Sequence, residues 1–521
     1  MNPSFLKIPS PFLPYGKGGK FPNRWRALTL SALLALTPAF AAQAAITVTN
    51  TNDSGAGSLR EAITLANDQG GTQTIGFAPA LAGQAIALGA VSSTPFGPSA
   101  LLVTGDVIID GGTSGVTITR DAAAQPTRLR LFFVANTGRL TLKNLNITGG
   151  LTRGANGVDG GGGGGGEAGL GGAVFNQGTL AISGCTFFGN SALGGAGGAG
   201  GGNLHGGKGG GALGGAGGEE GGTGGNGGSG GGGGGGGNAP CSFCDAGDGG
   251  FGGFGAGGGG GGNGYYDAGE GGSAGFGGGR GSYGRNFGGI SGGGGGGGGL
   301  GGAVFNDGGG VTVVNSTFTG NAAQGGARGA NPNLGEDGQG LGGALFSRNG
   351  TLDVSESTMS SNTANQGRGI YVVGDAAAVT AHIQNTIIGE SDTNASDFVA
   401  FSINGGTSTT SGIGNLIRTA FGFGGTVASS ADPLLGPLQN NGGPTPTMVL
   451  LAGSPAIDAG DPAFNPNASN PPLTTDQRGL PRVDHARIDI GAVESTHVDQ
   501  PPIANAGAGF SVNEGQLVTL D

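Results

Sequence analysis

The chain repeats a short pattern in which apolar and polar residues alternate and a short apolar segment ending in asparagine follows. One copy, "GLGGAVFNQGTLAISGCTFFGN", spans Gly169–Asn190, and similar copies end at Asn321 and Asn362. Apolar residues two positions apart indicate a half-buried β-strand, because successive side chains of a strand point to opposite faces. Each copy therefore predicts two or three short strands separated by turns that contain Asn and Gly.

Equivalent apolar positions recur when the copies are aligned on this asparagine. A unit of about 22 residues cannot bury its own apolar side, but stacked parallel units would join these positions into continuous columns, with Asn190 and Asn321 in a ladder. The pattern predicts an all-β, right-handed parallel β-helix, a pectin-lyase-like solenoid. The predicted columns place Leu180 with Leu140, Val311 and Leu352, Ile182 with Leu142, Val313 and Val354, and Phe187 with Ile147, Phe318 and Met359.

A helical segment precedes the repeats. In "SGAGSLREAITLAND", Ser58 and Glu61 have the S-x-x-E spacing of a capping box. The apolar residues that follow lie on one helical face. We expect a short amphipathic helix that covers the first coil, where an uncovered sheet edge would favour aggregation. Its apolar face consists of Leu59, Ala62, Ile63 and Ala66.

The first 44 residues predict a bacterial export signal. Basic residues precede the apolar run "ALTLSALLALTPAFA", and "AQA" at Ala42–Ala44 offers a cleavage site. The run is too short for a membrane span. Removing the five basic and no acidic residues of this segment changes the formal net charge from −11 to −16. Such acidity disfavours nucleic acid as a partner.

Glycine supplies 131 of the 521 residues, including 62 of the 110 positions from Ser191 to Leu300. We take residues 193–300 as an insertion at one coil corner, where neighbouring coils carry smaller glycine runs. One interpretation is a flexible tether, because glycine loses much entropy on ordering and has no side chain to bury. The alternative is a bundle of polyproline-II-like strands with glycine at every crowded contact. In that bundle Phe251, Phe254, Tyr265 and Tyr266 would be exposed or would pin its base.

The chain has three cysteines: Cys185 and the "CSFC" pair, Cys241 and Cys244. In an oxidising compartment we expect one disulfide, within the CxxC pair, and one remaining thiol. No second CxxC and no paired histidine motif accompanies this pair, so we do not expect a metal there.

Catalysis is an alternative, because many β-helices are polysaccharide lyases or hydrolases, which need clustered carboxylates and a basic partner. Asp353 and Glu356 are isolated, and the equivalent positions of the other copies are not acidic. We therefore predict no catalytic residues and no cofactor. The histidines are His205 inside the glycine block and His382, His485 and His497, which have no obvious carboxylate partner.

The densest group of charged residues lies near the C-terminal end. We interpret it as an ion-pair network in which two arginines join carboxylates of consecutive turns and seal the last coil. The alternative is a calcium site formed by the acids. The group comprises Asp458, Asp476, Arg478, Arg482, Asp489 and Glu494.

Three stretches resemble known bacterial surface proteins. "VTNTNDSGAGSLREAITLAN" resembles the CSLREA-type N-terminal domain of secreted β-helix proteins, with Gly57 at the position of the name-giving cysteine. "GGAVFN", "FFGN" and "FTGN" resemble the GGA(V/I/L) and FxxN repeats of polymorphic outer-membrane proteins, which are β-helical passengers associated with adhesion. The stretch from "DPLLGPLQNNGGPTPTMVLLAGSPAIDAGDP" to "DIGAVE", Asp432–Glu494, resembles the choice-of-anchor Q domain of surface proteins.

These matches predict four parts of the chain. A signal peptide (1–44) is followed by the cap and β-helix (45–390) and by choice-of-anchor Q-like C-terminal coils (391–496). The last part, 497–521, is a linker and the truncated start of a domain that resembles PKD or Ig-like domains. We therefore expect a fragment whose surface anchor lies beyond Asp521.

The predicted function is that of a secreted or cell-surface, non-catalytic adhesin or extracellular spacer. Its partner would be an extracellular ligand such as a glycan or the surface of a host or neighbouring cell, and its glycine-rich lobe would be a contact element. Two alternatives remain: a β-helical polysaccharide lyase, hydrolase or glycan-binding protein, and an autotransporter passenger of the outer membrane. The sequence leaves the oligomeric state open.

Overall fold

The computed structural model describes residues 45–92, 94, 96–113, 115–123, 128–286, 289–330, 335–389, 392–468, 471–484 and 487–495. The predicted signal segment, the predicted linker and PKD-like start, His485 and His497 lie outside these residues. The described chain is almost entirely β-structure, with one α-helix, α1 (Leu59–Gln69), and a short 3₁₀ turn at Pro79–Leu81.

The strands form three long sheets and two short ones at a corner. Sheet A contains β1 (Ile46–Val48), β2 (Thr72–Phe77), β5 (Asp106–Asp110), β8 (Arg139–Lys143), β13 (Thr179–Ser183), β18 (Gly310–Val314), β23 (Gly350–Ser355), β26 (Ala378–Gln384) and β29 (Thr407–Ser411). Sheet B contains β3 (Ala85–Leu88), β6 (Val116–Arg120), β9 (Leu145–Thr148), β14 (Thr186–Phe188), β19 (Thr317–Thr319), β24 (Thr358–Ser360), β27 (Ile387–Ile388), β30 (Asn415–Ile417) and β32 (Val427–Ser429).

Sheet C contains β4 (Ser99–Val103), β7 (Arg130–Val134), β12 (Val174–Asn176), β17 (Val304–Asp307), β22 (Leu345–Arg348), β25 (Ile370–Asp375), β28 (Phe398–Ile403) and β31 (Ala420–Phe421). The corner sheets are β10 (Leu151–Arg153), β15 (Ser191–Leu193) and β20 (Ala322–Gln324), and β11 (Gly169–Leu170), β16 (Gly299–Leu300) and β21 (Gly340–Leu341).

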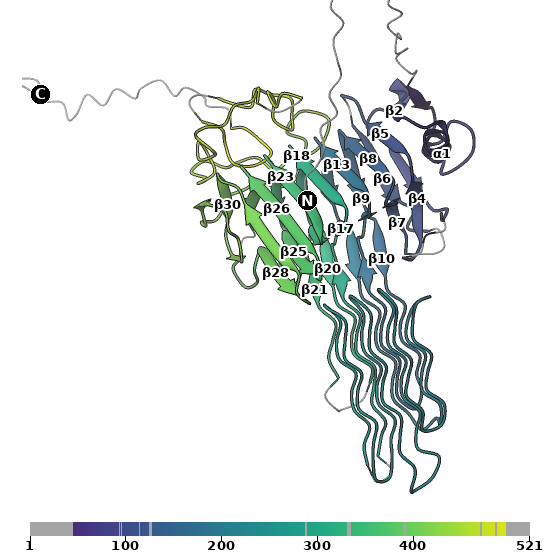
Figure 1. Ribbon diagram of the computed structural model, residues 1–521. Coiled ribbons are helices and arrows are strands. Elements are labelled where there is room, and N and C mark those ends of the chain that lie inside the picture. The colour runs from purple at the N-terminus through teal and green to yellow at the C-terminus, as the bar shows by residue number, and fades with distance from the viewer. Residues whose placement is uncertain are drawn as a thin grey trace, which may run out of the picture. The chain divides into compact units, whose positions relative to one another are not determined.

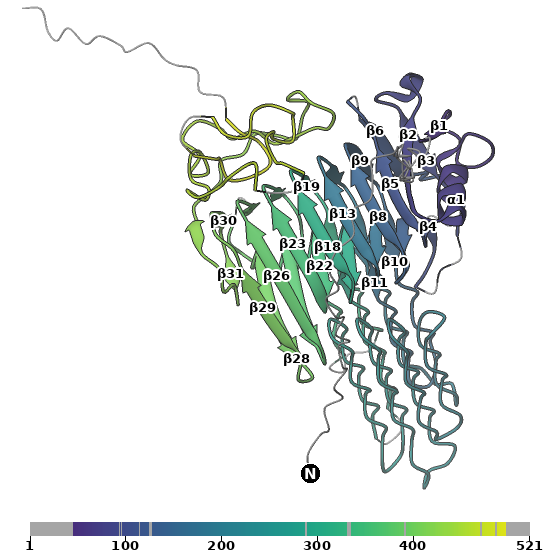
Figure 2. The ribbon, with the colours of Figure 1, turned by 45° about the horizontal axis from the view of Figure 1, so that its top comes forward.

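From β4 onward the chain visits sheets C, A and B in turn, and each strand pairs in parallel with the equivalent strand of the next coil. This order produces the stacked coils in Figures 1 and 2. The result is a solenoid-like parallel β-helix, as the repeats predicted. The predicted register is also confirmed: Leu180 pairs with Leu140 and Val311, and Phe187 pairs with Ile147 and Phe318.

The interior of the solenoid consists of apolar columns closed by an asparagine ladder. The rings of Phe187 and Phe318 stack with their centroids 4.7 Å apart. The amide Nδ2 of Asn190 donates to Oδ1 of Asn321 over 2.9 Å, and Asn321 donates to Asn362 over 3.0 Å. All three asparagines are buried. Because each buried amide is bonded to the next coil, the polar ladder holds the register of the columns.

Helix α1 begins at Ser58, whose Oγ accepts a hydrogen bond from the amide of Glu61. The carboxylate of Glu61 accepts from the amide of Gly57 rather than from that of Ser58, so the capping box is displaced by one residue. The predicted apolar face is buried, and the helix contacts β1, β2, β4 and β5 at the first coils. This agrees with the predicted position of the helix.

The C-terminal segment, residues 432–495, lies along the side of the solenoid (Figure 2), and its described residues form no β-strand. Gln477 contacts two successive coils at once, through Thr186 Oγ1 at 2.9 Å and Thr317 Oγ1 at 2.7 Å. The expectation of further coils over 391–496 is therefore right for 398–429, where β28 to β32 continue the stack, and wrong for the segment 432–495. This segment instead spans the side of several coils, with further bonds between Thr445 and Gly184, Ala492 and Thr358, and Asp461 and Asn385.

Candidate functional site

The chain leaves the solenoid at the same corner in three consecutive coils. These excursions are residues 154–168 between β10 and β11, 194–298 between β15 and β16, and 325–339 between β20 and β21. Figures 1 and 2 show them running out and back side by side beyond this corner. We call their described residues the glycine lobe, its turns next to the solenoid the root, and its far loops the tip.

The backbone of the lobe is ordered by hydrogen bonds that rotate with a period of three residues. Three successive amides of one segment donate to three different neighbouring segments. The fourth amide donates to the same neighbour as the first. A polyproline II helix has three residues per turn and no internal hydrogen bonds, so its amides are free to bond outward in this way. Along 162–169, the first set of amides is Gly162, Gly165 and Ala168, which donate to the carbonyls of Gly236, Gly233 and Gly230. The second set is Gly163, Gly166 and Gly169, which donate to Gly292, Gly295 and Gly298. The third set is Gly164 and Glu167, which donate to Val158 and Ala155.

Glycine is required because the segments touch through their backbones. A Cβ atom at Gly162 would overlap the carbonyl oxygen of Gly260, and one at Gly235 would overlap that of Gly162. Any larger residue would push two segments apart and break their hydrogen bonds. The flexible tether is therefore wrong for the described part of the block, and the polyproline-II-like bundle describes it.

The root of the lobe packs against the outer face of sheet C. Phe254 stacks on Phe276 at 5.7 Å between ring centroids, and each ring meets an aromatic residue of sheet C: Phe254 contacts Phe346, and Phe276 contacts Tyr371. The guanidinium of Arg348 lies 4.1 Å from the centroid of the Phe254 ring. The central strands of sheet C are thus covered on both faces, and the lobe has a fixed base.

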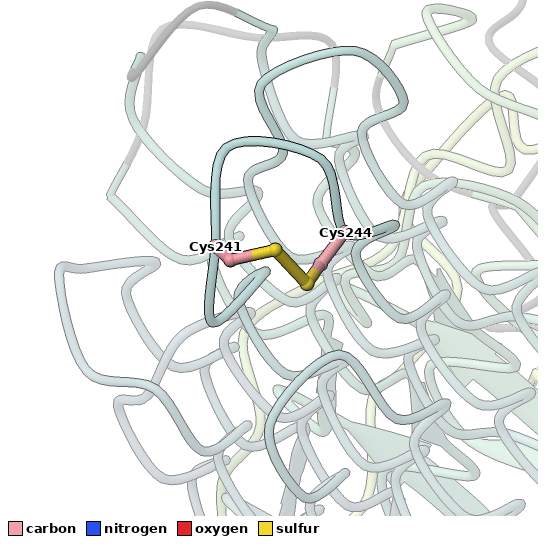
Figure 3. Close-up of a disulfide and its surroundings, with 2 residues drawn as sticks. All are labelled: Cys241 and Cys244. Carbon is pink, nitrogen blue, oxygen red and sulfur yellow. A yellow bond between two sulfur atoms is a disulfide. The ribbon is translucent and has the colours of Figure 1, made fainter.

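The tip carries exposed aromatic residues on two neighbouring loops. Phe243 is 83% exposed and lies between the two cysteines that form the disulfide of Figure 3, Cys241 and Cys244. Its ring stacks on Tyr266 at 5.7 Å, and Tyr266 meets Tyr265 at 5.0 Å. The tip therefore presents one cluster of contiguous rings, which we call the tip cluster.

Backbone bonds join the two loops that carry the tip cluster. The amide of Ala239 donates to Asn263, and the amide of Ala246 donates to Asp267. The exposed carboxylates of Asp245 and Asp267 follow the rings in sequence. Tyr265 and Tyr266 are expected in the lobe from the sequence, whereas Phe243 is not singled out there. The one sequence feature that could have indicated Phe243 is an aromatic residue inside a CxxC pair within a glycine-rich block.

The third cysteine, Cys185, is a free thiol with no exposed surface. Burial raises the pKa of this thiol to about 12. It occupies the ladder position that Ser316 holds in the next coil, and its amide donates to Ser316 Oγ. A thiol of this kind is inert toward oxidants and electrophiles, so Cys185 has a packing role.

The C-terminal charged group is only partly the predicted ion-pair network. Arg478 pairs with Asp476 at 2.7 Å. Asp476 also accepts a hydrogen bond from the amide of Glu494, and the amide of Asp458 donates to Asp489. The acids are therefore bonded largely to backbone amides.

Arg482 differs from the prediction. It is fully buried and donates to the backbone carbonyls of Asp489 and Gly491 instead of joining two carboxylates. Burial lowers the pKa of Arg482, and burial together with the nearby charge of Asp489 raises the pKa of Glu494 to about 7. A buried cation with two unbonded nitrogens, Nε and Nη1, is a structural feature of the segment and offers no open coordination site.

The residues considered for catalysis do not converge. Asp353 and His382 are register partners on β23 and β26, but they form no ion pair within 4 Å among the described residues. His382 instead contacts Ser411 and Gln384, and His205 pairs with Glu219 in the lobe. In the described residues no group of three or more His, Cys, Asp or Glu side chains has a geometry that could hold a metal ion.

No protein-family model, curated protein or solved structure matches this chain. Within the residues that the structure describes, no helix has both the length and the apolar character needed to cross a membrane.

Proposed function

We propose that this chain is an exported, cell-surface adhesion protein without catalytic activity. The β-helix is its support, and the glycine lobe carries the contact surface to an extracellular glycan coat. The observation that carries the proposal is the tip cluster, in which Phe243, Tyr265 and Tyr266 are exposed at the far end of an ordered lobe. Contiguous exposed rings mark interaction sites, and tyrosine is enriched among the residues that dominate binding energies.

Export supports the same role. The first 44 residues have the organisation of a secretory signal. A disulfide at the tip is stable only in an oxidising compartment, which agrees with an extracellular location. We further propose that the solenoid is right-handed and pectin-lyase-like, because crossovers between parallel strands are right-handed in nearly all proteins.

Rigidity of the lobe is central to this proposal. An ordered tip loses little conformational entropy on binding, so its contact energy is retained as affinity. The root rings Phe254 and Phe276 and the interlocked backbone hold the tip in place. Exposed carboxylates beside the rings, Asp245 and Asp267, can accept hydrogen bonds from sugar hydroxyls.

The test is binding of the exported chain to an array of immobilised neutral, amino and acidic glycans. We expect binding to at least one class, and we expect the double variant Phe243→Ser/Tyr266→Ser to lose at least tenfold in affinity. Leu65→Ser is the matched control, because Leu65 is 43% exposed on the outer face of α1. All variants should melt at the same temperature.

Two results would contradict the proposal. Equal glycan binding by the tip double variant and the wild type would show that the tip is not the contact surface. Release of unsaturated or reducing sugars from pectin or alginate, abolished by changing one carboxylate, would show that the protein is an enzyme.

A further inference from the structure

A cavity of about 440 Å³ lies at the root of the glycine lobe, on the side of the N-terminal coils. Its walls come from two different parts of the molecule: β7 and β10 of the solenoid, and lobe residues including 211–213 and 229–230. Figure 1 shows β7 and β10 beside the corner from which the lobe extends. A volume of this size lies in the range of small-molecule sites.

The charged residues that line this cavity are three arginines and one carboxylate: Arg128, Arg130, Arg153 and Glu167. None of the three arginines forms an ion pair within 4 Å among the described residues. In a chain of net charge −11 this is a local excess of positive charge. Elsewhere in the described structure arginines do pair with aspartates, as seen for Arg60, Arg348, Arg368, Arg418 and Arg478.

Arg130 forms the floor of the cavity and is held rigidly. It is 1% exposed, and its guanidinium donates to the backbone carbonyls of Phe96, Leu170 and Gly171 and to Ser99 Oγ. Burial lowers its pKa to about 9, and the nearby carboxylate of Glu167 partly offsets this effect. Arg130 therefore supplies positive potential, while direct contacts are left to the arginines at the rim.

The rim arginines are more accessible. Arg128 is half-buried, and Arg153 is exposed. Arg128 donates from Nη1 to the backbone carbonyl of Arg153 over 3.1 Å, which positions the two residues next to each other. The guanidinium donors that this bond does not use match the geometry of a carboxylate or another oxyanion.

A second feature of the cavity wall is a buried hydroxyl. Thr152 on β10 lines the same cavity and is 6% exposed, and its Oγ1 has no hydrogen-bond partner. A buried hydroxyl without a partner costs free energy, and such groups are normally bonded. The Oγ1 atom itself has almost no accessible surface, so a ligand hydroxyl would satisfy it only after the side chain rotates toward the cavity.

The walls also include apolar side chains, Phe96, Leu170 and Leu213. A bare inorganic ion would leave these surfaces and most of the volume unused. The arginines match an oxyanion, and the hydroxyl of Thr152 matches a ligand hydroxyl. The apolar walls match a compact carbon skeleton.

We propose that this root cavity binds a small hydroxylated organic anion, such as an acidic monosaccharide, through Arg128, Arg153 and Thr152. The site goes beyond the adhesion proposed for the tip, because it lies at the opposite end of the lobe. Since its walls come from both solenoid and lobe, the ligand bridges them.

Calorimetric titration of the exported chain with three probes tests the proposal. Glucuronate carries both the carboxylate and the hydroxyls, glucose only the hydroxyls, and inorganic sulfate only the charge. We expect glucuronate to bind at least tenfold more tightly than either of the others. Equal binding of sulfate would show a bare anion site, and equal binding of glucose would show that charge is not decisive; either result overturns the proposal, as does the absence of glucuronate binding at millimolar concentration.

Variants locate the site. Arg128→Gln and Arg153→Gln should each weaken glucuronate binding about tenfold or more, as expected when a charged hydrogen bond is lost. Arg139→Gln is the matched control, an exposed arginine on β8 of sheet A away from the cavity lining. Rim variants that bind glucuronate like the wild type would overturn the assignment. Unchanged glycan-array binding by these variants separates this result from the test of the tip.

Thr152→Val distinguishes a ligand contact from a packing role. The variant removes the unbonded hydroxyl while keeping the side-chain shape, so it should leave the thermal transition unchanged or raised. At the same time it should weaken glucuronate binding several-fold. A destabilised protein with unaltered binding would show that Oγ1 serves the fold alone and would remove Thr152 from the site.

Discussion

The rings of Phe187 and Phe318 stack with their centroids 4.7 Å apart and an angle of 9° between their planes, although the long glycine block separates them in the sequence. Both rings are fully buried. The solenoid thus passes through the site of the insertion without a break in its apolar column.

Replacing Phe187 with Asp should be severely destabilising, because it places a charge inside this column and removes a stacked ring. We expect a loss of more than about 4 kcal/mol in the free energy of unfolding, seen as insolubility or a greatly lowered melting temperature. Phe188→Asp is the control, since the next side chain on β14 is only partly buried. Similar melting of the two variants would contradict the assigned faces of the strand.

Substituting one interior glycine of the lobe should open it locally. A Cβ at Gly235 overlaps the carbonyl of Gly162, so Gly235→Ala should cost about 1–3 kcal/mol and accelerate hydrogen exchange of neighbouring lobe amides. At Gly202 a Cβ meets nothing within 4 Å, so Gly202→Ala should leave exchange unchanged. Equal, rapid hydrogen exchange of the lobe amides in the wild type and both variants would instead support the interpretation of the lobe as a flexible tether.

Deleting residues 194–298 and closing the gap with a short turn should leave the coils stacked but uncover the outer face of sheet C. Phe346 and Tyr371 would then face water, so we expect binding of hydrophobic dyes and lower solubility. Burial raises the pKa of Tyr371 to about 12, and in the deletion it should fall toward the ordinary value of about 10. Ultraviolet titration measures this change, and an unaltered value would mean that the lobe does not cover Tyr371.

Glu494 should make stability depend on pH. Its folded-state pKa is raised to about 7, above the ordinary value of 4.5, so its contribution is complete below pH 4.5 and is lost as the pH rises through 7. Glu494→Gln should therefore increase the free energy of unfolding at pH 8 by about 1–2 kcal/mol, seen as a higher melting temperature. It should also flatten the dependence of stability on pH between pH 5 and 8. Asp68→Asn, on the exposed surface of α1, is the control. A wild-type profile that rises with pH over this interval would contradict the assignment.

The solenoid could be predicted from the sequence because each coil repeats the same pattern of apolar residues and asparagine. Leu180, Phe187 and Asn190 have counterparts in the following coils, and identical residues can stack only if the coils are parallel and in register. The consecutive apolar residues Val174 and Phe175 also indicate a feature that was not predicted. Two consecutive apolar residues on one strand indicate burial on both faces, which here is the root of the lobe covering sheet C.

The order of the lobe could not be read from side chains, because glycine has none. What selects the fold is the fit of each backbone segment against its neighbours, and a flexible glycine linker has nearly the same composition. The root cavity was hidden for another reason. Arg130 and Arg153 lie on different strands, and Leu213 belongs to the insertion, so only the folded chain places them around one space.

The backbone-to-backbone construction of the lobe has a consequence for how it can change. Most of its inner contacts join backbone atoms, with buried side chains such as Asn238 and Ser291 as exceptions, so the residues displayed at the far loops contribute little to the support beneath. If the tip cluster is the contact surface proposed above, exchange of Phe243 or Tyr266 for other residues would alter the ligand that it binds and leave the lobe intact. On that proposal, the glycine lobe is a support whose contact residues can change at little structural cost.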